Sequence, residues 1–560
     1  MQAAKRVAKR AAACSNPRMT PVPTPAAERP APVGRRGSTY LAAFGERAPV
    51  RLPIRRTALV ALACELLAVK AAVIQPHALA RHVERFNSME PETVVNAIPN
   101  RDARVWLQAE IPWFECPDPE VEELYYFRWW TFRKHLVRTP DGYVITEFLR
   151  PVGHAGAFNT ISCAVGHHLT EGRWLRSKRY VDDDITFWLR GDGGKPQPHF
   201  HKYSSWFAAA VWERFLVNGD RGFVVDLLPD LVADYRTWVA ERQSAEGLFW
   251  QYDVRDGMEE SISGSRRQKH LRPTISSYMF ANARAIAAIA EVAGQADVAR
   301  EFQAEAERLR SLVGQRLWDP EAGFFKVCRE DGTLSNAREE IGFIPWMFHL
   351  PEPGAGREIA WAQFTDRDGF NAPFGLTTAE RRHPEFRSHG HGTCEWDGAV
   401  WPFATSQTLT ALGNVVRDYP PSVVSRADYF QAFLVYTRSQ RADGRPYIGE
   451  YLDETTGAWI DGRDDRSRYY NHSTHADLVI CGVVGVCPRP DNLVVVDPLL
   501  PPGVWDWFCL DGIPYHGRLL TVVWDRDGSR FGKGPGLRVM ADGQLIGRRR
   551  ALGRLTAPLP

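Results

Sequence analysis

The sequence lacks the features that define several common classes of protein. Its nine cysteines include no CxxC pair and are odd in number, which argues against a disulfide framework and a structural zinc site. We expect most of them to be buried thiols. The net charge is only +2, so there is no electrostatic case for binding nucleic acid. The histidines show no zinc spacing with a second half-site, so we expect neither a metal nor a cofactor.

Long hydrophobic runs are also scarce. An apolar run follows Arg55 and Arg56, but Glu65 and Lys70 interrupt it, and it is too short to span a membrane. A basic pair before an apolar run resembles the core of an export signal, although it lies far from Met1. One interpretation is export to the periplasm or the medium, with a true start downstream of Met1. The other is an ordinary amphipathic segment in a cytoplasmic protein.

The chain divides by composition into four parts. Residues 1–50 are rich in Arg, Ala and Pro and show little periodicity, so we expect a disordered basic extension. Residues 51–117 hold the possible export signal and a lead-in. Residues 118–487 have the periodicity of a large helical domain, and residues 488–560 have that of a small β domain.

Twelve segments have helical periodicity, and they alternate between segments that are apolar nearly all round and segments with a charged face. This alternation predicts an (α/α)6 barrel of six helical hairpins. Long connections rich in aromatic, Gly and Asp residues recur between them, and long loops in a compact domain are usually functional. We expect these loops, residues 246–272, 319–338, 366–395 and 443–470, to cluster at one end of the barrel. The expected helices are 120–138, 155–169, 174–189, 204–217, 223–242, 274–293, 296–318, 339–348, 358–364, 401–416, 427–441 and 473–486.

After Cys487 the pattern changes to short apolar strands. The expected strands are residues 493–496, 519–524, 537–540 and 545–546. Asp542 and Gly543 between the last two predict a tight hairpin turn. We expect a β appendage packed against the barrel, with a separate carbohydrate-binding module as the alternative.

Tryptophan is abundant, with 19 residues, as is common in proteins that bind carbohydrate. Residues 394–403 (CEWDGAVWPF) place Trp396 and Trp401 at the start of a helix, with Asp397 between them. A flat indole beside a carboxylate suits a pyranose ring, which has apolar C–H faces and hydroxyl edges. The alternative is an aromatic cluster of the core.

Two loops combine carboxylates with aromatic residues. Residues 249–261 (FWQYDVRDGMEES) contain Trp250 and four acids, three of which, Asp256, Glu259 and Glu260, fall within five residues. Residues 447–457 (YIGEYLDETTG) contain Glu450. Glycoside hydrolysis needs such a pair, because one carboxyl protonates the leaving oxygen and the other activates water or attacks the sugar. A solvated acidic loop is the alternative for either motif taken alone.

Together these motifs resemble the trehalase-like clan of six-hairpin glycosidases, which includes glycoside hydrolase family 63 and mannosylglycerate hydrolase. Residues 257–261 (GMEES) look like the clan's Gly-Trp/Met-Asp-Asn-Ser element, and residues 274–287 are similar to the helix that follows it. Residues 396–402 (WDGAVWP) resemble the Trp-Arg-Gly-Pro-x-Trp-Pro turn, and residues 450–457 resemble the base loop. The order matches over about residues 118–487. The resemblance implies an inverting, exo-acting glycosidase with Glu259 as general acid and Glu450 as general base.

Several positions depart from the clan's pattern. The acid is Glu rather than Asp, and Glu260 replaces an Asn, so a like charge next to Glu259 would raise one pKa of the pair. Asp256 is a further candidate for the acid, and Asp397 replaces an Arg. For contacts to the sugar we expect Trp396, Trp401, Asp397, Glu260 and Trp250, together with His391 just before the tryptophan turn.

We therefore predict a carbohydrate substrate and release of a terminal sugar with inversion. The alternatives on the same barrel are a phosphorylase, in which a phosphate site replaces the base, an isomerase, and a sugar-binding protein whose catalytic site has decayed. The sugar, its linkage, the aglycone and the oligomeric state stay open, with α-glucoside, α-mannoside and rhamnoside as the candidates.

Overall fold

The computed structural model describes residues 73–388, 394–421, 423–460 and 466–560. Contacts divide the chain into residues 1–63 and 64–560, and all described residues belong to the second unit. The expected basic extension and export signal therefore lie outside the described residues. Within the described ranges, no helix is long and apolar enough to cross a membrane.

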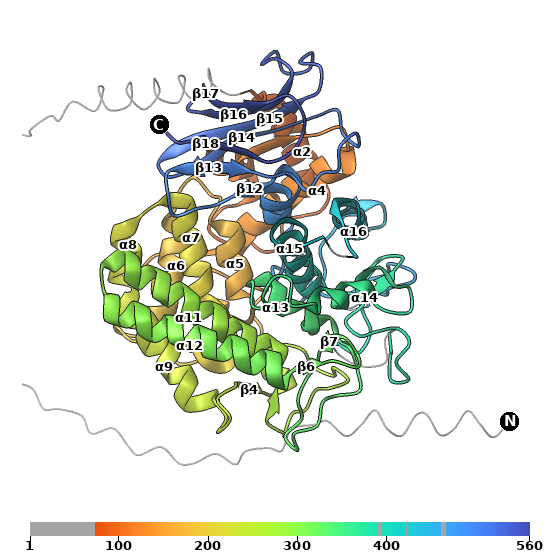
Figure 1. Cartoon of the computed structure of the whole chain (residues 1–560). Helices are drawn as coiled ribbons and strands as arrows, with labels where there is room; N and C mark the ends of the chain where they lie inside the picture. The colour runs from red at the N-terminus through yellow and green to blue at the C-terminus, as the bar shows by residue number, and fades with distance from the viewer. Residues whose placement is uncertain (1–72, 389–393, 422, 461–465) are drawn as a thin grey trace, which may run out of the picture. The chain divides into compact units, whose positions relative to one another are not determined.

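The second unit is mainly helical and ends in antiparallel strands, which confirms the predicted fold class in this general form (Figure 1). Helices near the predicted positions are α4 (Pro119–Phe132), α5 (Val165–Gly172), α6 (Arg179–Arg190), α7 (Phe207–Asn218), α11 (Pro273–Ala293), α12 (Ala296–Arg316), α13 (Ile344–Met347), α14 (Ala362–Thr365), α15 (Pro402–Asp418), α16 (Arg426–Ser439) and α17 (His475–Asp477). Among the described residues, the α-helices that were not predicted are α2 (Pro76–Ser88), α3 (Ala103–Glu110) and the short α10 (Asp253–Asp256).

The pair α11 and α12 illustrates how the sequence produces a helical hairpin. Helix α11 begins with Pro273, whose missing N–H costs nothing in the first turn, and it ends at Gly294, whose φ of 75° only glycine adopts easily. The buried residues of α12 are spaced by three or four, so it presents one apolar face. The two helices lie side by side (Figure 1).

Two helix predictions fail for reasons that can be identified. The single helix expected over 223–242 is two helices, α8 (Arg221–Asp226) and α9 (Leu228–Arg242), and Pro229 lies in the first turn of α9. A proline cannot donate the backbone hydrogen bond that a continuous helix requires there. The helix expected over 473–486 has only one α-helical turn, followed by a π-helix, η9 (Leu478–Val484).

The four predicted loops are joined to one another in series, as expected for loops that cluster. Leu271 forms a backbone bridge with Cys328, and Glu339 forms one with Ala379. Val400, which follows the third loop, bridges to Leu452 in the fourth. Segments far apart in the sequence thus form one continuous layer.

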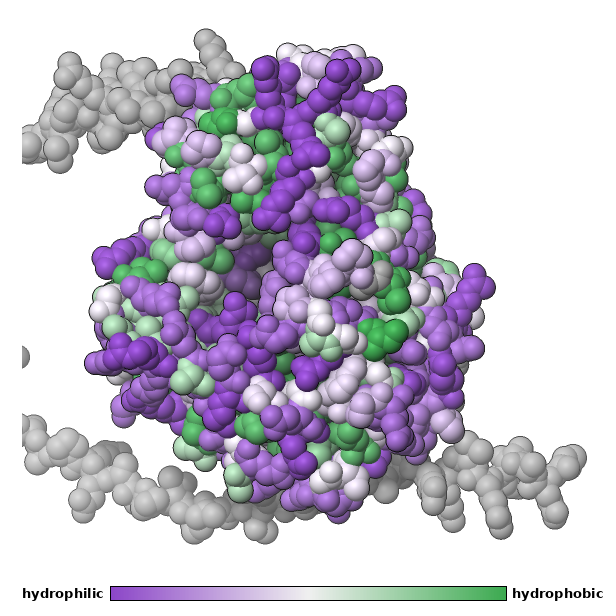
Figure 2. All heavy atoms as spheres, in the orientation of Figure 1, coloured by the Kyte–Doolittle hydropathy of each residue, from purple (hydrophilic) through white to green (hydrophobic). Residues whose placement is uncertain are grey.

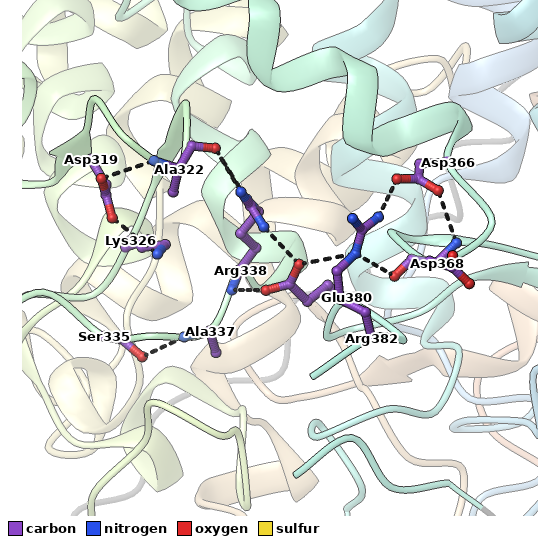
Figure 3. Close-up of polar contacts among 10 residues, drawn as sticks. All are labelled: Asp319, Ala322, Lys326, Ser335, Ala337, Arg338, Asp366, Asp368, Glu380 and Arg382. Atoms are coloured by element: carbon purple, nitrogen blue, oxygen red, sulfur yellow. Dashed lines mark hydrogen bonds and ion pairs between the residues drawn. The ribbon is translucent and has the colours of Figure 1, made fainter. Parts of the chain in front are cut away.

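A polar network fixes the second and third of these loops to each other (Figure 3). Arg338 Nη1 donates to Glu380 Oε2 at 2.9 Å, and Arg382 lies 3.6 Å from the same oxygen. Arg382 also pairs with Asp366. Two residues before Glu380, the Thr378 hydroxyl accepts a hydrogen bond from the Gly398 N–H at 3.1 Å. The network therefore supports the segment that holds the tryptophan turn.

The C-terminal strands form a five-stranded antiparallel sheet in the order β1-β14-β15-β16-β17 and a three-stranded sheet in the order β12-β13-β18. The hairpin predicted at Asp542 and Gly543 joins β16 to β17, and both residues have positive φ. Strand β1 pairs with β14, so the lead-in before residue 118 contributes to the C-terminal sheet. The strands are β1 (Trp113–Glu115), β12 (Val486–Cys487), β13 (Leu493–Val496), β14 (Trp507–Tyr515), β15 (Arg518–Asp525), β16 (Gly536–Ala541), β17 (Gln544–Arg549) and β18 (Leu555–Pro558).

One large hydrophobic core connects the helices with the sheets. The face drawn in Figure 2 is mostly hydrophilic, with apolar residues scattered over it. The cysteines among the described residues are free thiols, and four of these seven are buried, as predicted.

Candidate functional site

A cavity of about 380 Å³ lies where the loop layer meets the first turns of the helices. Three glutamates line it, Glu147, Glu259 and Glu450. Trp396 and Trp401 lie in its wall. It thus contains residues from both carboxylate motifs and from the tryptophan turn, which are up to about 190 positions apart in the chain.

Glu259 is presented by a sharp turn. Strand β4 (Trp250–Gln251) leads into the short helix α10 (Asp253–Asp256), which ends at Gly257 with φ of 71°. A Cβ at position 257 would lie 2.4 Å from the Cys163 sulfur, so both the backbone conformation and the space require glycine. Two residues later, the half-buried Glu259 side chain lies in the cavity wall.

Burial raises the pKa of Glu259 to about 7, and the negative charges of Glu450 and Asp253 act in the same direction. Hydrogen bonding from its own backbone and the positive charge of Arg266 oppose the rise. A carboxyl group with this pKa holds a proton near neutral pH, which is what a proton donor requires.

Glu450 has different surroundings. It is only 3% exposed, and its Oε2 accepts hydrogen bonds from Arg466 Nη1 and Ser467 Oγ, both at 2.7 Å. Two residues on, the Leu452 N–H donates to the Val400 carbonyl at 3.0 Å, and the Val400 N–H donates back at 2.9 Å. The Glu450 loop is thereby fixed to the tryptophan turn.

The two tryptophans belong both to the core and to the cavity wall. Trp396 and Trp401 are 2% and 3% exposed, and their rings stack with centroids 4.4 Å apart. Trp401 also stacks on Tyr451 at 4.8 Å. Because two aromatic partners compete with a sugar for the ring faces of Trp401, we expect this indole to contribute to the wall more than to act as a free platform.

Asp256 does not line the cavity. Its side chain is fully buried and accepts a hydrogen bond from Arg272 Nε at 2.7 Å and another from the Thr274 hydroxyl. Glu260 is also absent from the lining, and its backbone has a φ of 67°, in the left-handed region. Of the four acids in the first motif, only Glu259 lines the cavity.

Asp397 and Trp250, two more of the predicted contact residues, are also absent from the lining of this cavity. Asp397 is buried and paired with Arg387, whose Nε donates to it at 2.6 Å. The Trp250 ring lies beneath the cationic groups of Arg242 and Lys269, each 4.8 Å from its centroid. His391 lies outside the described residues.

Several residues that line the cavity were not among the predicted site residues. Glu147 follows the short strand β3 (Tyr143–Ile145) and is in neither motif. Lys202 and Arg255 bring positive charge to the lining, and His472 and Tyr470 bring aromatic rings. Tyr470 and His472 share this wall with position 147, more than 300 residues earlier in the chain, so only tertiary packing brings them together.

A second cavity, of about 470 Å³, lies between α7, α11 and α15 and the start of the C-terminal strands. Charged side chains in its lining are held by ion pairs and by backbone carbonyls. Arg173 pairs with Glu213 and Asp477, and Arg417 donates to the backbone carbonyls of Cys481 and Asp497. The cavity with the three glutamates is therefore the better candidate for chemistry. Within the described ranges, no group of three or more His, Cys, Asp or Glu residues is arranged to hold a metal ion.

Comparison with known proteins gives matches to two domains. The mannosylglycerate hydrolase MGH1-like glycoside hydrolase domain matches residues 157–473, and the C-terminal domain of glycosyl hydrolase family 65 matches residues 489–547. The first match includes Glu259 and Glu450, and the second corresponds to the predicted β appendage.

Among solved structures, a chain named sialidase is 48% identical to this one with a TM-score of 0.86. The match covers 87% of this chain and 45% of that chain, so this protein spans less than half the length of that relative. A family 78 rhamnosidase of Bacillus sp. GL1 is 14% identical over 77% of this chain and 42% of its own, with a TM-score of 0.55, which is a likeness of fold.

A family 63 mannosylglycerate hydrolase from Thermus thermophilus, solved with glucose, is 16% identical over 64% of this chain and 99% of its own, with a TM-score of 0.47. The clan predicted from the four motifs is confirmed by the domain match, which covers more than half of the residues. The chain belongs to the mannosylglycerate hydrolase MGH1-like glycoside hydrolase family.

Proposed function

We propose that this protein is an inverting, exo-acting glycoside hydrolase built on an (α/α)6 barrel. The observation that carries the proposal is the presence, in one cavity, of two glutamates with different surroundings. Burial and nearby negative charge raise the pKa of Glu259 to about 7, whereas Glu450 accepts hydrogen bonds from Arg466 and Ser467. Pairs of carboxyls whose environments differ in this way are typical of an acid and a base.

In the proposed reaction, the Glu259 carboxyl donates its proton to the glycosidic oxygen as the bond to the anomeric carbon breaks. The Glu450 carboxylate removes a proton from a water molecule, which attacks the opposite face of the sugar. The product therefore has the inverted configuration. We expect the two carboxyl groups to lie about 6.5–9.5 Å apart, because an inverting enzyme must place water between the base and the sugar.

Other residues would orient the substrate. The wall formed by Trp396 and Trp401 offers apolar surface to the C–H groups of a pyranose ring. Arg466 holds Glu450 through Oε2, so it would act as a positioning residue for the base. A cavity of about 380 Å³ is at the small end of ligand sites, which supports recognition of a terminal sugar rather than a long polymer.

The test is a panel of aryl and natural glycosides, including α-glucosides, α-mannosides and α-rhamnosides, with the product anomer followed by NMR. Immediate release of the inverted anomer is the expected result. Release of the retained anomer would contradict the assignment of Glu450 as a base. Acceleration by inorganic phosphate would favour a phosphorylase. Sugar binding by calorimetry without turnover over days would favour a binding protein.

A second candidate is cleavage of an acidic terminal sugar. The solved chain named sialidase is 48% identical over most of this protein, and Lys202 and Arg255 bring positive charge to the cavity. The match covers 45% of that chain, however, so its name describes a protein of which less than half is represented here. A fluorogenic sialic acid glycoside in the same panel separates the two candidates.

A further inference from the structure

Glu147 is the third carboxyl group of the cavity, and neither the motifs nor the proposed mechanism uses it. It follows β3 and is only 5% exposed. It lines the same space as Glu259 and Glu450, and the negative charges of both influence its ionisation. A buried acid in this position has a structural role or a role toward the ligand, and its contacts distinguish the two.

The contacts of Glu147 connect it to the loop of the proposed base. The Tyr470 hydroxyl donates a hydrogen bond to Glu147 Oε1 at 2.7 Å, and the Asn471 N–H donates to the Glu147 carbonyl at 3.0 Å. The Tyr470 N–H in turn donates to the carbonyl of Ile448 at 3.2 Å, two residues before Glu450. Backbone and side chain are therefore both fixed in position relative to Glu450.

The next residue reinforces this arrangement. The Phe148 ring lies 4.8 Å from the guanidinium of Arg466, the residue that pairs with Glu450. It also meets Tyr470 edge to face at 4.6 Å. Residues 147 and 148 thus form a rigid part of the wall beside Glu450.

One carboxyl oxygen of Glu147 has no hydrogen-bond partner among the described residues. This oxygen, Oε2, is buried, although buried polar groups in proteins are nearly always paired. Burial raises the pKa of the side chain to about 8, with Glu450 adding to the rise and the Tyr470 hydrogen bond opposing it. A neutral carboxyl can both donate and accept a hydrogen bond, as a hydroxyl group does.

We propose that Glu147 binds a hydroxyl group of the terminal sugar and thereby determines which neutral sugar the site accepts, a role that rests on the proposed glycosidase function. Within the part of the chain that the structure describes, the Oε2 atom of Glu147 lacks the hydrogen-bond partner that a sugar hydroxyl would supply. A carboxylate on the sugar at this position would meet a second buried acid, so an acidic group is disfavoured at this end of the cavity. Specificity arises because an analogue without the hydroxyl leaves the buried oxygen unpaired.

A nearby acid provides a matched control. Asp184 on α6 is also buried, its pKa is also raised to about 8 by burial, and its Oδ2 also lacks a partner among the described residues. Its Oδ1 accepts a hydrogen bond from the Ile145 N–H at 3.0 Å, two residues before Glu147, but Asp184 does not line the cavity. Asp184 therefore supports the same segment without reaching the ligand.

The experiment measures kcat/KM for the best aryl glycoside of the panel and for its monodeoxy analogues, using the wild type, Glu147→Ala, Glu147→Gln and Asp184→Asn. For one deoxy position, we expect the wild type to lose about 10- to 100-fold, as for a hydrogen bond involving a charged or strongly polar group. In Glu147→Ala, kcat/KM for the parent glycoside should fall by a similar factor. The same variant should show no additional loss when that one hydroxyl is removed from the substrate. Glu147→Gln should retain part of the discrimination, and Asp184→Asn should retain all of it.

Two results would overturn the proposal. The first is that, at every deoxy position, the loss caused by Glu147→Ala multiplies the loss caused by removing the hydroxyl. Such independence in free energy would mean that Glu147 contacts none of these hydroxyls. The other is the same discrimination profile in Glu147→Ala and Asp184→Asn. If Glu147→Ala does not fold, Tyr470→Phe removes the hydrogen bond that orients Glu147. This variant should weaken discrimination at the same single position, and unchanged discrimination would count against the proposal.

Failure of the proposed function gives a different result. If the wild type hydrolyses no glycoside, binding of the free monosaccharides glucose, mannose and rhamnose is measured by NMR titration. Binding that weakens about 10-fold in Glu147→Ala but not in Asp184→Asn would support the role of Glu147 without hydrolysis. No binding of any of these sugars to the wild type would overturn both proposals.

Discussion

Replacing Glu259 by glutamine tests the central assignment, because the amide keeps the shape of the side chain but cannot supply a proton. With a pKa of about 7, about half of the Glu259 side chains are protonated at pH 7. An ordinary glutamate with a pKa of about 4.3 would be protonated in only about 0.2% of molecules at that pH. Burial thus increases the amount of the acid form about 250-fold at neutral pH.

The expected loss depends on the leaving group. Glu259→Gln should lower kcat/KM by about 10²- to 10⁴-fold for a natural glycoside, whose alkoxide leaves poorly without protonation. The loss should be much smaller for a p-nitrophenyl glycoside, which leaves as a stable anion. Glu450→Gln should be slow with both substrates, because activation of water is needed in either case.

The pH profile gives an independent result. Glu259 must be protonated to act, so the activity of the wild type should decline as the pH rises through about 7. This decline should disappear in Glu259→Gln when the p-nitrophenyl substrate is used. Glu260→Gln serves as the neighbouring control, since Glu260 does not line the cavity, and any loss there should be equal for both leaving groups. Equal losses on both substrates in Glu259→Gln, with the decline above pH 7 retained, would refute the assignment.

Three further predictions concern the support of the site. Asp256→Asn breaks the buried ion pair with Arg272 and should lower the free energy of unfolding, measured by urea titration, by about 3–5 kcal/mol. If stability is unchanged and activity falls only on glycosides with poor leaving groups, Asp256 is the acid instead. Gly257→Ala should lower activity, because its Cβ would lie 2.4 Å from the Cys163 sulfur. Adding Cys163→Ala removes this clash and should restore part of the activity, although the left-handed backbone at position 257 still costs about 1 kcal/mol. A double variant no more active than Gly257→Ala would argue against the clash. Burial raises the pKa of Asp184 to about 8 in the folded state. Between the unfolded pKa of about 3.9 and this value, the folded protein holds a proton that the unfolded chain has lost. The free energy of unfolding therefore falls as the pH rises through this window, by up to about 1.4 kcal/mol per pH unit. Asp184→Asn should therefore raise Tm relative to the wild type more at pH 9 than at pH 5, and a constant difference would contradict this.

The prediction of the helices succeeded where local signals agreed. Helix α11 was predicted over 274–293 and spans Pro273–Ala293, because the sequence supplies an apolar surface, a proline at its start and a glycine after its end. The hairpin turn at Asp542 and Gly543 was equally local, since few residues other than these tolerate positive φ. The region before residue 118 was less predictable, since β1 has three residues and gains its partner only from β14.

The candidate site divides in the same way. The sequence by itself determined the two carboxylate motifs and the tryptophan turn, because their spacing and their order resemble a family. It could not distinguish Asp256 from Glu259, since both occur within one turn of the chain. The tertiary structure separates their surroundings, because Asp256 pairs with Arg272 in the interior and Glu259 lines the cavity, which supports Glu259 as the proposed acid.

Glu147 depended wholly on tertiary structure. Nothing near it in the sequence marks it, and its partner Tyr470 lies 323 positions further along the chain. Local rules describe residues within a helical turn or a hairpin of one another. The role proposed for this carboxyl group depends on its burial, on the hydrogen bond it receives and on the charges that face it, and these arise only when distant segments pack together.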